Sequence, residues 1–172
     1  MSIKFRKLND SEEDYLKLYN WCQNDYVYEW FEQRILSYDE IVNKYKSKLE
    51  NRKQDIFIIR LNNEDIGLVQ IYKYDNDINI DLKYKNIYEY DLFIGEENYI
   101  NKGIGRDIVL YINNFIYENY KVDGIILRPF KRNIRAVKCY LKCGFKKILE
   151  YQGTDTLGNK EDILVLLNRK EL

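Results

Sequence analysis

The sequence contains no histidine, three cysteines and one proline among its 172 residues. Without histidine, Ser-His-Asp and Cys-His triads are impossible within the chain, and the usual general base at neutral pH is missing. Proton transfer must therefore use Asp, Glu, Tyr, Lys, Cys or water. An odd number of cysteines without metal-ligand spacing argues against a disulfide framework and against most zinc sites. We therefore expect no metal and a reducing, cytoplasmic location.

A net charge and a long apolar run are also missing. Lysine and arginine together number 28, as do aspartate and glutamate, so no overall field recruits nucleic acid or an anionic membrane. Residues 1–20 carry repeated charges instead of an apolar run, and no later stretch reaches the roughly 20 apolar residues of a membrane span. The sequence therefore predicts a soluble protein that has no signal peptide and binds neither nucleic acid nor membrane.

The length fits a single domain over residues 1–172, and the order of predicted elements is mixed α/β. Periodicity and turn residues give the expected elements. Helices are expected at 16–22, from 37 to about 49, at 105–120 and at 133–142, and strands at 3–8, 55–61, 65–74, 88–94, 124–127, 145–151 and 163–168. The aromatic and acidic stretch at 24–31 receives no element.

Local signals mark several of these boundaries. Ser37 with Glu40 three residues later resembles a capping box, and Gly144 is a good C′ glycine. Residues 75–86 are polar and are expected to form a loop, but a short strand stays open because three apolar residues alternate there. They are Ile78, Ile80 and Leu82.

A glycine turn at Asn101-Lys102-Gly103-Ile104-Gly105 opens one of the predicted helices. Free backbone N–H groups and the positive end of the helix dipole can hold phosphate at such a place. The turn lacks the third glycine of a dinucleotide fingerprint and the Gly-Lys-Ser/Thr ending of a P-loop, which disfavours dehydrogenase and kinase interpretations. The plain alternative is that the glycines only permit a tight turn.

A second motif follows about thirty residues later, from Asn133-Ile134-Arg135-Ala136 to Cys143-Gly144-Phe145. It places Tyr140 on a helix downstream of the glycine turn. Alone, residues at this helical spacing more often belong to a core than to a site. The ordered pair of motifs is more informative than either one.

Residues 88–145 resemble the acetyl-CoA-binding half of the GCN5-related N-acetyltransferase (GNAT) superfamily and are especially similar to aminoglycoside 6'-N-acetyltransferases. The two motifs above and the phrase Tyr90-Asp91-Leu92-Phe93-Ile94-Gly95-Glu96 carry the resemblance, and Val27-Tyr28-Glu29-Trp30 and residues 66–72 extend it upstream. The resemblance implies the GNAT fold. This is a central, twisted, mostly antiparallel sheet of six to seven strands, flanked by helices, with two splayed central strands.

The resemblance also implies acetyl-CoA as the cofactor. Pantetheine would lie between the splayed strands, and pyrophosphate would lie on the N–H groups of about Asn101 to Arg106. Asn133 resembles the family position that touches the cofactor arm, and Tyr140 resembles the tyrosine that protonates the departing thiolate. The full set of expected cofactor contacts is Leu92, Phe93, Ile94, Asn101, Lys102, Gly103, Ile104, Gly105, Arg106, Asn133 and Ala136.

Attack of an amine on a thioester requires a group that receives the amine's proton, because an ammonium group cannot attack. Asp91 matches an acidic residue that the aminoglycoside branch uses near the reacting amine, so we expect it to act as the base directly or through water. An ordinary aspartate pKa of roughly 3.9 is low for this role, but burial and Glu89 two residues earlier would raise it. The alternative is that Asp91 only binds the cationic substrate.

The acceptor implied by the resemblance is a small polycationic amine, an aminoglycoside. Such a molecule needs a locally acidic pocket despite the neutral total charge, with aromatic side chains for sugar rings or cation–π contacts. Because aromatic residues make up 15% of the chain, Trp30 can equally well cover the core. Besides Asp91, the expected substrate contacts are Asp25, Glu29, Trp30, Gln70, Tyr72 and Glu89.

One departure concerns the residue before Pro129, where the aminoglycoside branch commonly has an aspartate and this chain has Arg128. A cation there disfavours a polycationic acceptor unless Arg128 turns away or pairs with an acid. Three alternatives therefore stay open: a GNAT enzyme acting on a polyamine, metabolite or protein amine, an acetyl-CoA sensor without turnover, and a scaffold. Both a monomer and a homodimer are compatible with the sequence.

Overall fold

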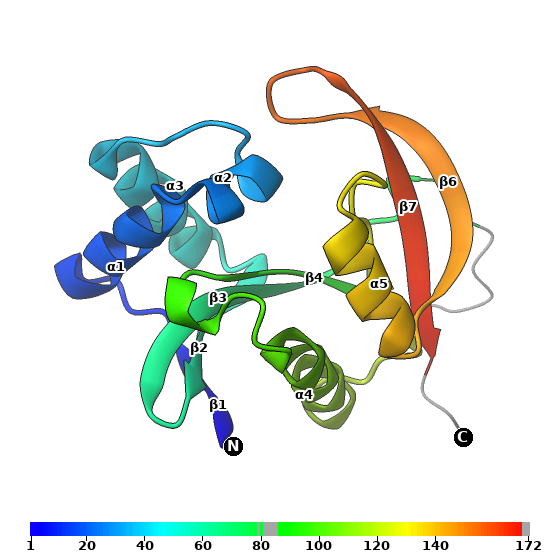
Figure 1. Cartoon of the computed structure of the whole chain (residues 1–172), viewed down its shortest axis with the longest axis horizontal. Coiled ribbons are helices and arrows are strands. Elements are labelled where there is room, and N and C mark those ends of the chain that lie inside the picture. Colours follow the sequence, from blue (N-terminus) through cyan, green and yellow to red (C-terminus); the bar gives the residue numbers. More distant parts are fainter. Residues whose placement is uncertain (79, 81–85, 170–172) are drawn as a thin grey trace. The chain divides into compact units, whose positions relative to one another are not determined.

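The computed structural model describes residues 1–78, 80 and 86–169, and within them seven strands form one sheet of order β1-β2-β3-β4-β5-β7-β6 (Figure 1). The elements are β1 (Ile3–Lys7), α1 (Glu12–Cys22), α2 (Asp25–Phe31), α3 (Tyr38–Asn51), β2 (Gln54–Leu61), β3 (Glu64–Lys73), β4 (Ile87–Ile94), the 3-10 helix η1 (Glu97–Tyr99), α4 (Ile104–Asn119), β5 (Gly124–Leu127), α5 (Ile134–Lys142), β6 (Lys146–Thr154) and β7 (Lys160–Arg169). The mixed α/β class and the seven-stranded, mostly antiparallel sheet confirm the expected fold.

The chain forms two compact units. The first unit contains residues 1–71, 91–100 and 155–157, and the second contains residues 72–90, 101–154 and those from 158 onward. The division falls within β4, between Tyr90 and Asp91.

The first unit contains helices α1, α2 and α3 and the antiparallel pair of β1 and β2, in which Ile3 lies opposite Leu61. Apolar residues from the helices and strands share one core, which includes Leu18, Ile41, Ile58, Leu68 and Phe93. The predicted capping box is confirmed: the Ser37 side chain accepts from the Glu40 N–H, and the Glu40 carboxylate accepts from the Ser37 N–H.

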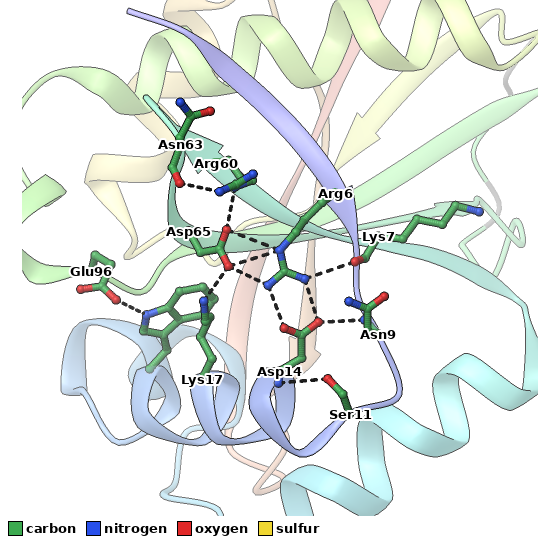
Figure 2. Close-up of polar contacts among 11 residues, drawn as sticks. Arg6, Lys7, Asn9, Ser11, Asp14, Lys17, Arg60, Asn63, Asp65 and Glu96 are labelled. Carbon is green, nitrogen blue, oxygen red and sulfur yellow. Dashed lines mark hydrogen bonds and ion pairs between the residues drawn. The ribbon is translucent and has the colours of Figure 1, made fainter.

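An ion network joins β1, α1 and the start of β3 in the first unit (Figure 2). Arg6 donates to both oxygens of Asp14, at 2.8 and 2.7 Å, and to Asp65, at 2.6 Å. Lys17 and Arg60 also lie against Asp65, at 2.5 and 2.9 Å. Burial alone would raise the pKa of Asp65, but hydrogen bonds from Arg6 and Lys17 lower it to about 2.

The second unit contains α4, α5, β5 and the long hairpin of β6 and β7, drawn orange to red in Figure 1. The parallel register of β4 with β5 covers Ile87 to Glu89, the first three of the eight residues of β4, which agrees with splayed central strands. Helix α4 buries one apolar face, with Ile108, Ile112 and Ile116 fully buried.

One assignment needs correction. Residues 25–31, which received no element, form α2, because Val27 is buried in the core and Phe31 packs edge-on against Phe93 with ring centroids 5.0 Å apart. The loop expected at 75–86 agrees with the described residues, since Ile78 and Ile80 lie outside any strand; Leu82, the third alternating residue, lies outside the described residues. No helix in the part of the chain that the structure describes is long and apolar enough to cross a membrane.

Candidate active site

The turn before α4 has the backbone of an anion-binding loop. Asn101 and Gly103 both adopt left-handed conformations, with φ of 59° and 78°. Gly103 is the N-cap of α4, and no side chain caps the helix there. The first N–H groups of α4 therefore point outward at the positive end of a 16-residue helix, where an anion is stabilised.

Space above the turn is open. A Cβ on Gly103 would meet no atom within 4 Å, and a Cβ on Gly105 would meet only the Cys139 sulfur, at 3.9 Å. The described residues leave room for a phosphate group to approach the backbone here. The chemistry and shape of this loop thus fit a pyrophosphate.

Cations gather around this turn. Lys102 and Arg106, both expected cofactor contacts, are exposed. Arg135, which the sequence reasoning did not select, lies on the first turn of α5 and donates to the Asn101 side-chain oxygen, at 3.2 Å. The residue stands in the motif that carried the resemblance, but its approach to Asn101 joins positions 34 residues apart and has no local signal.

Helix α5 holds the expected tyrosine. Asn133 is its N-cap, and the side-chain oxygen accepts from the Ala136 N–H at 3.2 Å. Tyr140 is half-buried, with its ring 6.0 Å from that of Phe145. Gly144 follows the helix in a left-handed conformation, as predicted for a C′ glycine. The position of Tyr140 is therefore fixed by a capped and well-terminated helix.

Asp91 lies in the first unit, on the part of β4 that precedes the turn, and its side chain is exposed. The burial that was expected to raise its pKa is therefore not observed. Two residues further on, the Phe93 side chain packs against Trp21 and Phe31, so only its backbone is available to a ligand. That agrees with main-chain recognition of pantetheine by residues 92–94.

Two lysines that the sequence reasoning missed lie near Asp91. Lys48 of α3 donates to the side-chain oxygen of Gln70, at 2.6 Å, and Lys44 forms an ion pair with Glu32. Burial, with added repulsion from Lys48, lowers the pKa of Lys44 to about 8, although Asp91 acts in the opposite direction. Burial also lowers the pKa of Lys48, and the Asp91 carboxylate opposes part of this shift. The region around Asp91 is therefore less acidic than expected.

The other predicted acceptor contacts are divided between the units. Asp25 and Glu29 are exposed on α2 and Trp30 is half-buried there, while Gln70 is buried on β3, all in the first unit. Tyr72 and Glu89 belong to the second unit.

Arg128 pairs with two acids, which is one of the two arrangements in which it would not disfavour a polycationic acceptor. Its guanidinium donates to both carboxylate oxygens of buried Glu89, at 2.7 and 2.8 Å, and to both oxygens of Asp77, at 3.0 and 2.8 Å. Burial would lower the pKa of Arg128, but these two acids raise it. The charge of Arg128 is thus balanced within the second unit, and the repulsion that Glu89 was expected to exert on Asp91 is offset.

Residues 1–78, 80 and 86–169 contain no candidate metal-binding site. No group of three or more Cys, Asp or Glu side chains there is arranged to hold a metal ion.

Comparisons with known proteins agree with this geometry. The family model described as acetyltransferase (GNAT) domain matches residues 10–152. Aminoglycoside N(6')-acetyltransferase type 1 of Klebsiella pneumoniae is 23% identical over 171 residues, covering 93% of this chain and 81% of that protein. A kanamycin resistance protein of Rhizobium radiobacter is 26% identical over 80 residues, covering 46% of this chain and 70% of that protein.

Solved structures show the same fold. AAC(6')-Ib in complex with paromomycin and acetyl-CoA superposes with a TM-score of 0.80 at 21% identity, covering 99% of this chain and 94% of the other. Spermidine N-acetyltransferase from Vibrio cholerae, in complex with CoA and spermine, gives 0.78 at 18% identity, with coverages of 98% and 95%.

Proposed function

Because the chain belongs to the acetyltransferase (GNAT) domain family, we propose that it is an acetyl-CoA-dependent N-acetyltransferase that modifies the 6'-amine of an aminoglycoside and thereby confers resistance. The uncapped, glycine-lined N-terminus of α4 is the observation that carries the proposal, because it suits a pyrophosphate. The names of the curated relatives support the aminoglycoside acceptor.

Acetyl-CoA would supply the acetyl group as a thioester. The chain would hold it through the backbone N–H groups of residues 101–106, with charge from Lys102, Arg106 and Arg135 and with backbone contacts from residues 92–94. Asn133 and Ala136, at the start of α5, would complete the binding of the cofactor arm.

The chemistry requires two proton movements while the C–N bond forms and the C–S bond breaks. Asp91 takes a proton from the acceptor ammonium, directly or through water, so that the nitrogen lone pair can attack. The Tyr140 hydroxyl gives a proton to the leaving sulfur. Both residues belong to the kinds of proton-transfer group that remain in a chain without histidine.

The acceptor would be bound by acidic and aromatic side chains. Asp25 and Glu29 offer exposed carboxylates on α2, and Trp30 and Tyr72 offer ring surfaces. Gln70 and Glu89 are the remaining proposed contacts, although each already accepts a hydrogen bond from a cation, Lys48 and Arg128 respectively.

A polyamine is the second candidate acceptor. The exposed carboxylates of Asp25 and Glu29 suit the ammonium groups of a linear polyamine as well as those of an aminoglycoside. In this alternative the proposed donor site and the roles of Asp91 and Tyr140 are unchanged, and the two candidates differ only in the amine that is acetylated.

An acceptor panel tests the proposal. Thiol release from acetyl-CoA is measured with kanamycin, tobramycin, spermidine and no acceptor, and each product is mapped by NMR. The proposal predicts turnover with kanamycin and tobramycin and acetylation at the 6'-amine. Turnover with spermidine alone would favour the second candidate, and tight acetyl-CoA binding without turnover on any amine would favour a sensor.

A further inference from the structure

Two ammonium groups flank one aromatic ring on α3. Lys44 and Lys48 are one helical turn apart, and their Nζ atoms lie 5.5 and 5.8 Å from the centroid of the Tyr45 ring. Tyr45 is fully buried and its pKa is raised by burial. Both lysine charges therefore lie over a ring that belongs to the core of the first unit.

Both charges act on the proposed acceptor region. Lys48 donates to the side-chain oxygen of Gln70, a proposed acceptor contact, and the Asp91 carboxylate opposes the burial that lowers the pKa of both lysines. Lys44 has Glu32 as an ion-pair partner, whereas Lys48 donates a hydrogen bond to the neutral amide of Gln70.

A further ammonium group close to Lys48 would be repelled, because Glu32 pairs with Lys44 and the proposed partner of Asp91 is the reacting amine. Partly buried charges interact more strongly than charges in water, because less solvent screens them. The lowered pKa of each lysine has burial as its largest cause, and for Lys44 repulsion from Lys48 comes second. A neutral or anionic substituent would avoid the repulsion, and an anionic one would also pair with Lys48.

We propose that the Lys44–Lys48 pair selects acceptors by charge. It disfavours an acceptor that carries a second ammonium beside the reacting amine, and it favours one that carries a hydroxyl or an anionic group there. The proposal rests on the proposed function, because it takes Asp91 to lie beside the reacting amine.

The test uses two acceptors that differ at one substituent. Kanamycin A carries a hydroxyl at the 2' position and kanamycin B an amine, and both carry the 6'-amine. Dissociation constants are measured by calorimetry and kcat/KM by thiol release, for the wild type and for Lys48→Gln, Lys48→Arg, Lys44→Gln and Lys46→Gln. Lys46 is exposed on the same helix and serves as the matched control for loss of one positive charge.

The wild type is expected to prefer kanamycin A. Lys48→Gln keeps a hydrogen-bonding side chain and should reduce this preference about 5-fold, with a similar change in Lys44→Gln. Lys48→Arg keeps the charge and should keep the preference, as should Lys46→Gln.

Three results would overturn the inference. They are an unchanged preference in both Lys48→Gln and Lys44→Gln, an equal loss of preference in Lys46→Gln, and no binding of either acceptor, which would also overturn the proposed aminoglycoside function. Selective binding that depends on Lys48 but leads to no turnover would overturn the proposed function and support the charge selection.

Discussion

At the residue scale, Arg128 shows that acidic neighbours can balance a charge that departs from the family pattern. Sequence reasoning identified the departure but not its partners, because Glu89 lies 39 positions away and Asp77 lies 51 positions away. Two bidentate contacts balance the guanidinium, so Arg128 no longer argues against a cationic acceptor on its own. Lys44 and Lys48 of α3 are instead the cations that would disfavour a second ammonium group on the acceptor.

Tyr140→Phe tests the proposed acid. The substitution keeps the ring that packs against Phe145, so acetyl-CoA affinity should stay within about 2-fold, while transfer should slow by roughly 100-fold because the proton donor is lost. Single-turnover kinetics and calorimetry separate the two effects. Equal transfer rates would remove Tyr140 from this role.

Asp65 connects charge to stability. Its folded pKa of about 2 lies below the unfolded value of 3.8, so the carboxylate stabilises the fold fully above pH 4, and this contribution is lost as the pH falls toward 2. The contribution is about 2 kcal/mol, since each pKa unit corresponds to about 1.4 kcal/mol. Because Asp65 is only 11% exposed, solvent screening takes little from this value.

Asp65→Asn should lower the free energy of unfolding at pH 7 by about 3 kcal/mol, more than the titration of Asp65 alone, because Arg6, Lys17 and Arg60 also lose a shared charged partner. Denaturant unfolding from pH 7 to pH 2 should also show a shallower decline than in the wild type. Asp39→Asn, at an exposed position on α3, is the control. Parallel curves for wild type and Asp65→Asn would contradict the assignment.

At the element scale, the proposed role of the turn before α4 can be tested by substituting Gly103, with Gly158 as the control for backbone strain. Gly103→Ala should weaken acetyl-CoA binding by about 10-fold, because the Cβ enters the space proposed for the pyrophosphate. Gly158→Ala imposes the same strain, since Gly158 has φ of 83° and nothing within 4 Å of its Cβ. Both variants should lose similar stability, and calorimetry should show weaker binding in Gly103→Ala alone; equal affinities would contradict a phosphate site.

Elements with local signals were predictable from the sequence. The capping box of Ser37 and Glu40 and the C′ role of Gly144 depend on residues a few positions apart, and both are confirmed. Helix α2 was missed because its formation depends on distant packing against Phe93. The approach of Arg135 to Asn101 and of Lys48 to Gln70 was missed for the same reason.

At the scale of the whole molecule, the numbers of acidic and basic residues are equal, but charges of one sign cluster locally. The first unit carries exposed acids on α2 and a lysine pair on α3, and the second carries the glycine turn before α4. The family match covers residues from both units, which supports the expectation of one functional domain over residues 1–172. That expectation, and the choice between monomer and homodimer, stay predictions.

The central claim is acetyl transfer to an aminoglycoside amine with Asp91 as the proton acceptor. The most direct measurement incubates the wild type and Asp91→Asn with labelled acetyl-CoA and kanamycin and quantifies the product acetylated at the 6'-amine. Because Asp91 is exposed, its replacement removes no core packing, and Asp39→Asn again controls for the loss of one carboxylate. We predict a 6'-acetylated product whose rate of formation falls about 100-fold in Asp91→Asn alone; no such product, or an equal rate in Asp91→Asn, would contradict the claim.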